Sequence, residues 1–185
     1  MTNAQRLKIL IDTGKTVFSS KNIQSLWKGS PEAAKIALKR MVERQLIIKL
    51  AKGYYALSEN FDIYELANLI ISPSYISFNS ALFYHGISFQ TSDIVTSVGL
   101  LSYQKKIKKV TFQYYAMKES LFFNLEGIGY KNNLAIALPE RAILDSFYFG
   151  LLPNIDNFDK ISINHLRKLS VYYPKVVSRK LKKLL

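Results

Sequence analysis

The chain has 185 residues, no cysteine and a formal net charge of +13 at pH 7. The lack of cysteine excludes disulfides, cysteine-ligated zinc and a thiol nucleophile. About half of the residues are apolar, which is enough for a folded core. His85 and His165 lack metal-ligand spacing, so we expect no metal and no cofactor. No apolar run is long enough to cross a membrane and the start is no signal peptide, so we expect a cytoplasmic protein without membrane contact.

The charge is spread unevenly along the chain. Residues 1–57 hold eleven Lys or Arg and three Asp or Glu, a balance of +8. Residues 58–150 balance to −1, and residues 151–185 to +6. A basic head, a neutral middle and a basic tail predict a polyanion bound at one or both ends.

The first predicted elements are helices. Residues 3–13 carry apolar side chains at helical spacing, which predicts a first helix, and Gly14 is a suitable place for it to end. Ser19 or Ser20 caps a second helix, after which Lys28 and Gly29 form a turn. Ser30 is a favourable N-cap for a third helix because Pro31 follows it at the first helical position. The third helix would bury the stripe Ala34, Ala37, Leu38, Met41 and Val42.

A short hairpin is predicted directly after the third helix. Residues 46–50 and 54–57 suit two strands, and the segment 51–53 connects them. Three helices followed by a basic hairpin are typical of a winged helix-turn-helix, which we place at residues 1–58. The third helix would enter the major groove, and the hairpin would contact phosphates. The expected DNA-binding residues are Ser20, Lys21, Ser30, Lys35, Lys39, Arg40, Lys52 and Tyr54.

The same pattern also occurs in units that only bind other proteins. The balance of +8 favours DNA over that alternative, because basic patches mark nucleic-acid footprints.

Residues 59–185 predict a second, mixed α+β domain. Helices are expected at 61–71, 77–86, 139–149, 161–169 and 176–185, and strands at 91–98, 105–115, 128–130 and 134–138. The fold class is therefore α+β, with a winged helix, a small mixed domain and basic C-terminal helices. A partner surface is expected on its basic residues, Lys105, Lys106, Lys108, Lys109, Arg167, Lys168 and Arg179. DNA, RNA and an acidic protein all remain open as partners of the tail.

No catalytic residues are expected. Glu140 and Asp145 lie five residues apart and do not share a helix face well. Arg141 and Asp145 are spaced to pair with each other, and Glu140 suits a helix start. Ser80 lies in no nucleophile-elbow pattern, and His85 suits a helix C-terminus.

Three blocks of the sequence carry a resemblance to a known family. Residues 73–77 (PSYIS), 80–82 (SAL) and 84–86 (YHG) resemble the core of the AbiEi-type antitoxins of bacterial abortive-infection, type IV toxin–antitoxin systems. Residues 137–145 (ALPERAILD) are similar to a second block of that family. Residues 37–44 and 53–57 are similar to its winged-helix end. The blocks occur in the family's order within residues 5–150.

The resemblance implies an antitoxin that represses its own operon by binding promoter repeats. Its second domain would neutralise a cognate nucleotidyltransferase-type toxin, with or without a direct complex. The alternative is a plain winged-helix regulator whose second domain senses a ligand or partner. An enzyme is a further rival, but neither a Glu-x-Lys triplet nor a Gly-Ser followed by Asp-x-Asp occurs here.

Overall fold

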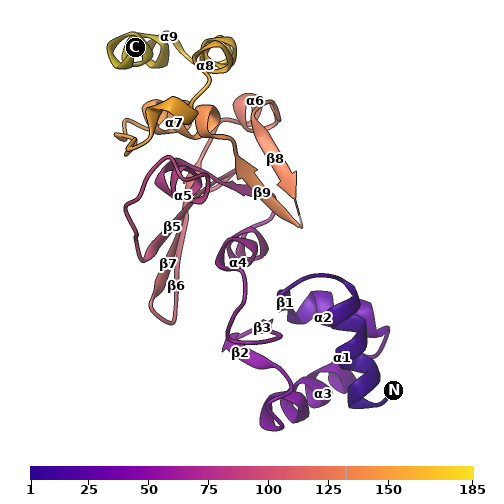
Figure 1. The fold of residues 1–185 in the computed structure, drawn as a ribbon. Coiled ribbons are helices and arrows are strands. Elements are labelled where there is room, and N and C mark those ends of the chain that lie inside the picture. The colour runs from indigo at the N-terminus through magenta and orange to yellow at the C-terminus, as the bar shows by residue number, and fades with distance from the viewer. Residues whose placement is uncertain (132) are drawn as a thin grey trace. The chain divides into compact units, whose positions relative to one another are not determined.

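A computed structural model describes residues 1–131 and 133–185. It has a mixed α+β fold, which confirms the predicted class, and it divides into two compact units, Met1–Ile70 and Ile71–Leu185. Figure 1 labels the elements of both units. Among the described residues, none of the helices combines the length and apolar character that crossing a bilayer requires.

The N-terminal unit combines helices with a small antiparallel sheet of order β1-β3-β2. Its elements are α1 (Asn3–Asp12), β1 (Val17–Ser19), α2 (Ser20–Trp27), α3 (Pro31–Glu43), β2 (Ile48–Ala51), β3 (Tyr54–Ala56) and α4 (Ile63–Ile70). The three predicted N-terminal helices and the hairpin are confirmed. Strand β1 was not expected, because three residues are too few to show a strand's alternation.

Side-chain caps fix where the first helices begin. Thr2 and Ser19 each form a capping box, and the Ser30 hydroxyl accepts a hydrogen bond from the Ala33 N–H. Helix α2 ends at Lys28, whose φ of 50° turns the chain towards α3. The buried stripe of α3 then packs on α1 and α2 in an apolar core made of Leu10, Phe18, Ile23, Trp27, Ala34, Ala37, Leu38, Met41 and Ile47.

The units divide at residue 70 rather than at the predicted residue 58. Helix α4 packs on β1 and so belongs to the N-terminal unit. The Thr16 N–H and hydroxyl both donate to the Glu65 carboxylate, at 2.9 and 2.6 Å. The Asp62 N–H in turn donates to the Thr16 hydroxyl. These bonds join segments 46 to 49 residues apart, which local sequence patterns do not reveal.

The C-terminal unit is built on a six-stranded mixed sheet of order β6-β7-β5-β4-β9-β8. Strands β4 and β9 are parallel, as are β5 and β7, and the other neighbours are antiparallel. The strands are β4 (Ser74–Ile76), β5 (Ile94–Gly99), β6 (Tyr103–Ile107), β7 (Val110–Ala116), β8 (Ile128–Lys131) and β9 (Leu134–Ala137). The helices are α5 (Phe78–Tyr84), α6 (Glu119–Phe122), α7 (Pro139–Tyr148), the 3-10 turn η1 (Phe158–Lys160), α8 (Ile163–Ser170) and α9 (Lys175–Leu184).

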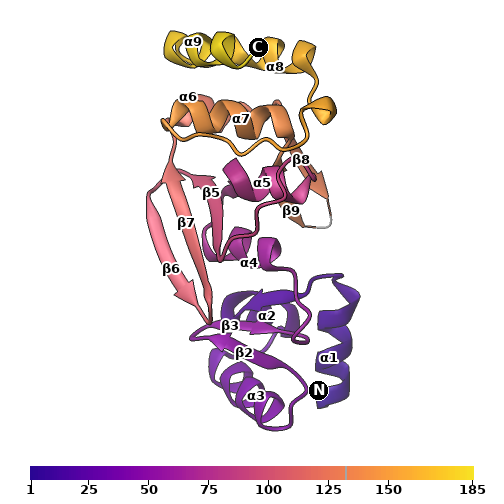
Figure 2. The same ribbon diagram turned by 60° about the vertical axis from the view of Figure 1, so that its left-hand side comes forward.

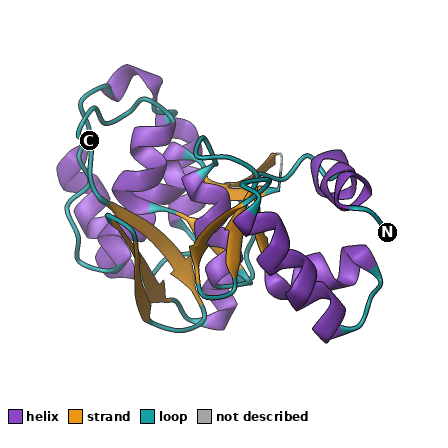
Figure 3. Ribbon diagram, turned by 90° about the horizontal axis from the view of Figure 1, so that it is seen from below, coloured by secondary structure: helices purple, strands orange, loops and turns teal. Residues whose placement is uncertain are grey.

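Helices cover this sheet in layers. Helix α5 packs on β5, α7 packs on α5 and β9, and α8 and α9 both pack on α7. Figures 1 and 2 show α8 and α9 as the outermost layer of the unit, and Figure 3 shows helices gathered against the strands. Helix α7 is therefore covered on two sides, and residues 140–147 are all buried.

One predicted strand is wrong. Residues 105–115 were expected to form a single strand, but β6 and β7 form a hairpin that turns at Lys108 and Lys109. Lys108 adopts a φ of 53°, a conformation that lysine rarely takes. A lysine at this position therefore does not predict a turn.

Candidate nucleic-acid interface

Helix α3 buries one side and exposes the other. Ala34, Ala37, Leu38 and Met41 face the core, as expected. Lys35, Lys39 and Arg40 are exposed and lie on the opposite half of the helix. The structure thus places three of the predicted DNA-binding residues on the solvent side of one helix.

The start of α3 is also exposed. Ser30, Pro31, Glu32 and Ala33 are all accessible to solvent. The Ser30 hydroxyl caps the helix, accepting from the Ala33 N–H at 3.2 Å. Its remaining donor, the hydroxyl hydrogen, is available to an acceptor such as a phosphate oxygen. Ala33 has a small side chain, so a ligand can approach the backbone closely here.

The other predicted residues gather at the tip of the β2–β3 hairpin. The Ser20 N–H donates to the Gly53 carbonyl at 2.9 Å, so the tip is joined to the start of α2. Strand pairing sets Ser19 opposite Tyr54. The tip turns at Lys52 and Gly53, where Gly53 has a φ of 85° that a side chain would disfavour. Ser20, Lys21, Lys52 and Tyr54 therefore lie close together; Ser20 and Tyr54 are half-buried and the two lysines are exposed.

Most of these cations form no ion pair with the residues that the structure describes. This holds for Lys21, Lys35, Arg40 and Lys52. Lys39 approaches Glu43 at 3.8 Å, but both side chains are well exposed, so the pair contributes little stability. The charges of this surface remain available to an anionic ligand.

One residue of this surface was missed by the sequence analysis. Ile36 is 53% exposed near the middle of the solvent side of α3. An exposed isoleucine among lysines offers an apolar contact of the kind that a thymine methyl group makes in the major groove. Ile36 lies outside the predicted buried stripe of this helix, and that position in the sequence already indicated that its side chain would be exposed.

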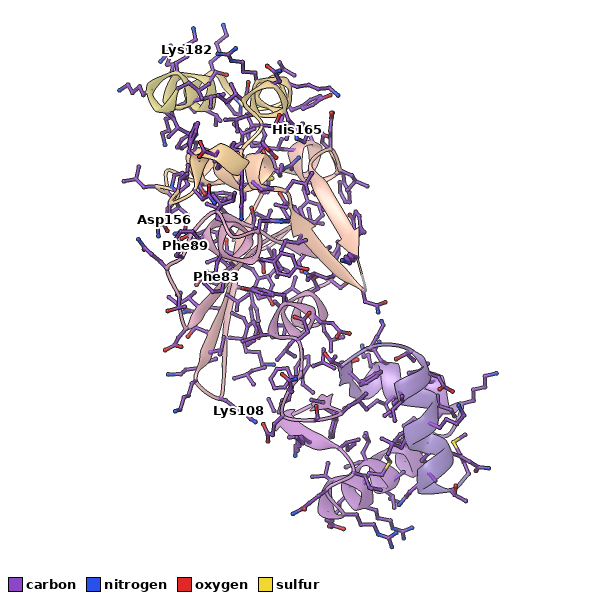
Figure 4. All side chains as sticks on the ribbon, in the orientation of Figure 1. Phe83, Phe89, Lys108, Asp156, His165 and Lys182 are labelled. Atoms are coloured by element: carbon purple, nitrogen blue, oxygen red, sulfur yellow. The ribbon has the colours of Figure 1, made fainter. Side chains whose placement is uncertain are left out.

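The predicted partner surface of the C-terminal unit forms two separate patches. Lys105, Lys106, Lys108 and Lys109 lie on the β6–β7 hairpin, whereas Arg167, Lys168 and Arg179 lie on α8 and α9. Figure 4 shows Lys108 and Lys182, a residue of α9, at opposite ends of this unit. One small partner would therefore not contact both patches at the same time.

Lys168, one of these predicted residues, forms a salt bridge within the unit. The Lys168 ammonium donates to the Glu126 carboxylate at 2.8 Å. The Lys168 and Tyr172 side chains lower the pKa of Glu126 through hydrogen bonds. Arg167 and Arg179 are exposed and form no ion pair with the described residues.

The C-terminal unit holds its own charged residues inside. Arg141 and Asp145 have fully buried side chains, and the Arg141 Nε lies 3.3 Å from Asp145 Oδ1. The predicted pairing of these two residues is confirmed, although their complete burial was not expected. The remaining Arg141 nitrogens donate to the Tyr75 hydroxyl and to the backbone carbonyls of Leu121, Asn124 and Glu126, among others.

The Asp145 carboxylate accepts from three hydroxyls as well. Tyr173 donates to Oδ1 at 2.6 Å, while Ser77 and Tyr75 donate to Oδ2 at 2.7 and 3.1 Å. We call Tyr75, Ser77, Arg141, Asp145 and Tyr173 the buried polar network. It joins β4, α7 and the segment between α8 and α9.

The pKa values of the buried polar network reflect its surroundings. Burial raises the pKa of the Asp145 carboxyl, although Arg141 and the hydroxyl donors oppose that shift. Burial also raises the pKa of the Tyr75 and Tyr173 phenols well above the ordinary value. Burial alone would lower the pKa of Arg141, but Asp145, Tyr75 and Tyr173 together outweigh it, so the pKa rises and the guanidinium stays charged.

Two further predicted features of this unit serve the fold. Glu140 was expected to favour a helix start, and it is buried, accepting from the Ser162 N–H at 2.8 Å at the beginning of α8. Ser77 stands at the N-cap of α5, where the predicted helix 77–86 begins, but its hydroxyl makes no cap bond because it donates to Asp145. His85 is the C-cap of α5, and its Nε2 lies 2.9 Å from the Ala137 carbonyl.

The motif residues therefore meet in space. Tyr75 and Ser77 come from the first block of the resemblance, and Arg141 and Asp145 come from the second. Because they are buried and hydrogen-bonded, they hold the unit together and cannot touch a partner directly. The described residues contain no group of three or more His, Asp or Glu side chains arranged to hold a metal ion.

No protein-family model matches the sequence, and a search of curated proteins finds no match either.

Proposed function

We propose that the protein binds double-stranded DNA through its N-terminal unit, in the manner of a winged helix-turn-helix. The observation that carries this proposal is the pairing of a cationic, solvent-facing α3 with a hairpin whose tip is also cationic. Lys35, Lys39 and Arg40 lie on α3, and Lys21 and Lys52 lie at the tip. In winged helix-turn-helix proteins a helix enters the groove of the DNA and a hairpin contacts its phosphate backbone.

In this proposal the exposed half of α3 enters the major groove. Lys35 and Lys39 are four residues apart, so they stand one helical turn apart along the groove. Ile36 and Ala33 add apolar surface next to them, suited to thymine methyl groups. Ser20, Lys21, Lys52 and Tyr54 would contact phosphates and fix the register without reading the bases.

The wider role that we propose is that of an antitoxin that represses its own operon. This part rests on the resemblance of residues 73–86 and 137–145 to the AbiEi-type antitoxins. The C-terminal unit would neutralise a cognate nucleotidyltransferase-type toxin without enzymatic activity of its own. Because the buried polar network is inaccessible, the exposed surface of the C-terminal unit would neutralise the toxin.

The test of DNA binding is a gel-shift titration of the full chain with DNA from upstream of its own gene. Replacing Lys35→Glu and Lys39→Glu removes two phosphate or base contacts, so affinity should fall by more than about fiftyfold at about 0.1 M salt. The matched control is Lys118→Glu with Lys131→Glu, which reverses two exposed charges outside the N-terminal unit. Unchanged affinity of the α3 variant, with its helix content intact, would remove α3 from the interface.

The same variants test the antitoxin role. Each full-length chain is co-expressed with the neighbouring candidate toxin, and growth is scored. The α3 variant should lose repression of a promoter–reporter fusion yet still restore growth. Failure of the wild-type chain to restore growth would reduce the proposal to a plain transcriptional regulator.

A further inference from the structure

The outer face of α9 carries charge of only one sign. Lys175, Arg179, Lys182 and Lys183 are all exposed, and the helix buries Val177 and Leu181 on its other side. At 100° per residue these four cations fall within an arc of about 100°, opposite the buried residues. We call these four residues the α9 stripe.

The α9 stripe has no compensating acid close in sequence. No Asp or Glu follows Asp159 in the chain. The four side chains also form no hydrogen bond or ion pair with any residue that the structure describes. Since like charges on one helix face repel each other, such a stripe lowers stability slightly and is best explained by an anionic ligand.

Other cations of the same region are committed to the fold. The Lys180 ammonium donates to the Phe147 carbonyl at the end of α7, at 3.0 Å. Lys168 pairs with Glu126. Contacts within the fold therefore account for Lys180 and Lys168, and the helix dipole favours Lys182 and Lys183 in the last turn of α9. No such reason applies to Lys175, in the first turn, where the dipole disfavours a cation, or to Arg179 in the middle of the helix.

The α9 stripe suits a phosphate backbone better than a protein. It extends about 12 Å along the helix, which corresponds to roughly three phosphates of one DNA strand. Lysine is depleted in protein–protein interfaces, where ordering its long side chain is costly, but it is abundant in nucleic-acid footprints. Three of the four residues are lysines. Figures 1 and 2 show α9 in the outermost layer of its unit, and Figure 4 shows Lys182 at its surface.

We propose that the α9 stripe is a second contact surface for double-stranded DNA, one that binds the phosphate backbone without regard to sequence. This inference rests on the proposed DNA binding of the N-terminal unit and extends it to the other unit. Helix α3 would select the site, and α9 would add affinity for whichever duplex lies beside it. Contacts to phosphate oxygens of this kind fix the position of a protein on DNA without reading the bases.

The experiment measures binding of the full chain to a labelled duplex of arbitrary sequence over a range of salt concentrations. Replacing Arg179→Gln and Lys182→Gln should make the slope of log K against log salt shallower by about 1.8, and should weaken binding about tenfold to sixtyfold at about 0.1 M salt. The control Lys118→Gln with Lys131→Gln removes the same charge from exposed positions elsewhere in the unit. It should change affinity by less than about twofold if specific contacts decide the result.

Several outcomes would overturn the inference. The inference fails if the α9 variant keeps the affinity and the salt slope of the wild-type chain. It also fails if the control variant loses as much affinity as the α9 variant, since net charge alone would then be responsible. Tighter wild-type binding to an RNA duplex of the same sequence, lost in the α9 variant, would replace DNA by RNA. If upstream DNA is bound and only the α3 variant weakens it, the inference fails while the proposed function stands. If no duplex is bound at all, both fail.

Discussion

The two units differ in where they place their Lys and Arg residues. In the N-terminal unit no Lys or Arg is buried, and the core around Met41 is entirely apolar. In the C-terminal unit the Arg141 and Asp145 side chains are fully buried, and their hydrogen bonds go to buried or partly buried groups. The role of a charged side chain in this protein therefore depends on whether it is buried or exposed. Exposed cations are available for a ligand, whereas buried ones determine how helices and strands fit together.

The largest effect is expected from Arg141→Leu. The change leaves the Asp145 carboxyl buried without its cationic partner, and it deprives three backbone carbonyls of their donor. We expect the C-terminal unit to lose about 3–5 kcal/mol of stability. Hydrogen-exchange mass spectrometry should show that residues 71–185 lose protection from exchange while residues 1–70 keep theirs.

The exposed Arg167 supplies the control for that change. Arg167→Leu should alter stability by less than about 0.5 kcal/mol. Full protection of the C-terminal unit in the Arg141 variant would mean that apolar packing alone holds it, and the contrast between the units would disappear.

The converse experiment is Met41→Ala. Met41 is completely buried in the core of the N-terminal unit, so its truncation should cost about 2–5 kcal/mol. Ile36→Ala shortens an exposed side chain on the same helix and should cost less than about 0.5 kcal/mol. Exchange protection should now be lost in residues 1–70. A comparable loss in both units would show that they unfold together.

A smaller effect should follow Tyr173→Phe. The change removes one hydroxyl that donates to the Asp145 carboxylate at 2.6 Å and keeps the ring. We expect a loss of about 1.5–3 kcal/mol, as for other hydrogen bonds to a charged group. Tyr130→Phe, at a tyrosine that is 67% exposed, is the control in urea denaturation. Equal midpoints for the two variants would argue against a role of the hydroxyl in stability.

The smallest effect is expected from Ser30→Ala at the start of α3. The hydroxyl accepts from the Ala33 N–H, and such caps contribute about 1 kcal/mol. Ser25→Ala, at an exposed position inside α2, serves for comparison in thermal denaturation. If the Ser30 variant melts no earlier than the Ser25 variant, water satisfies the freed N–H as well as the cap does.

Local patterns in the sequence were sufficient for most of the N-terminal unit. The Ser30 and Pro31 pair and the apolar stripe of α3 together define a helix start and a buried face. The cations of α3 were found for the same reason, since a residue off the stripe is exposed. The boundary at residue 70 was missed because the bonds between Thr16 and Glu65 bridge distant segments.

The buried polar network could not be predicted in the same way. Arg141 and Asp145 have the spacing of an ordinary surface pair, and the donors Tyr75, Ser77 and Tyr173 lie 28 to 70 residues away from Asp145. One clue was present. The apolar residues of α7 surround the helix instead of forming one stripe, which indicates cover on two sides and hence buried charges.

The place of Tyr173 in the chain has a consequence for synthesis on the ribosome. A chain grows from its N-terminus and its domains generally fold as they emerge, so residues 1–70 can complete their apolar core early. Asp145 must wait for its last donor until residue 173 has been made. A transcript cut short before that codon would yield a chain with a finished N-terminal unit and an unstable remainder, which proteases can recognise and remove.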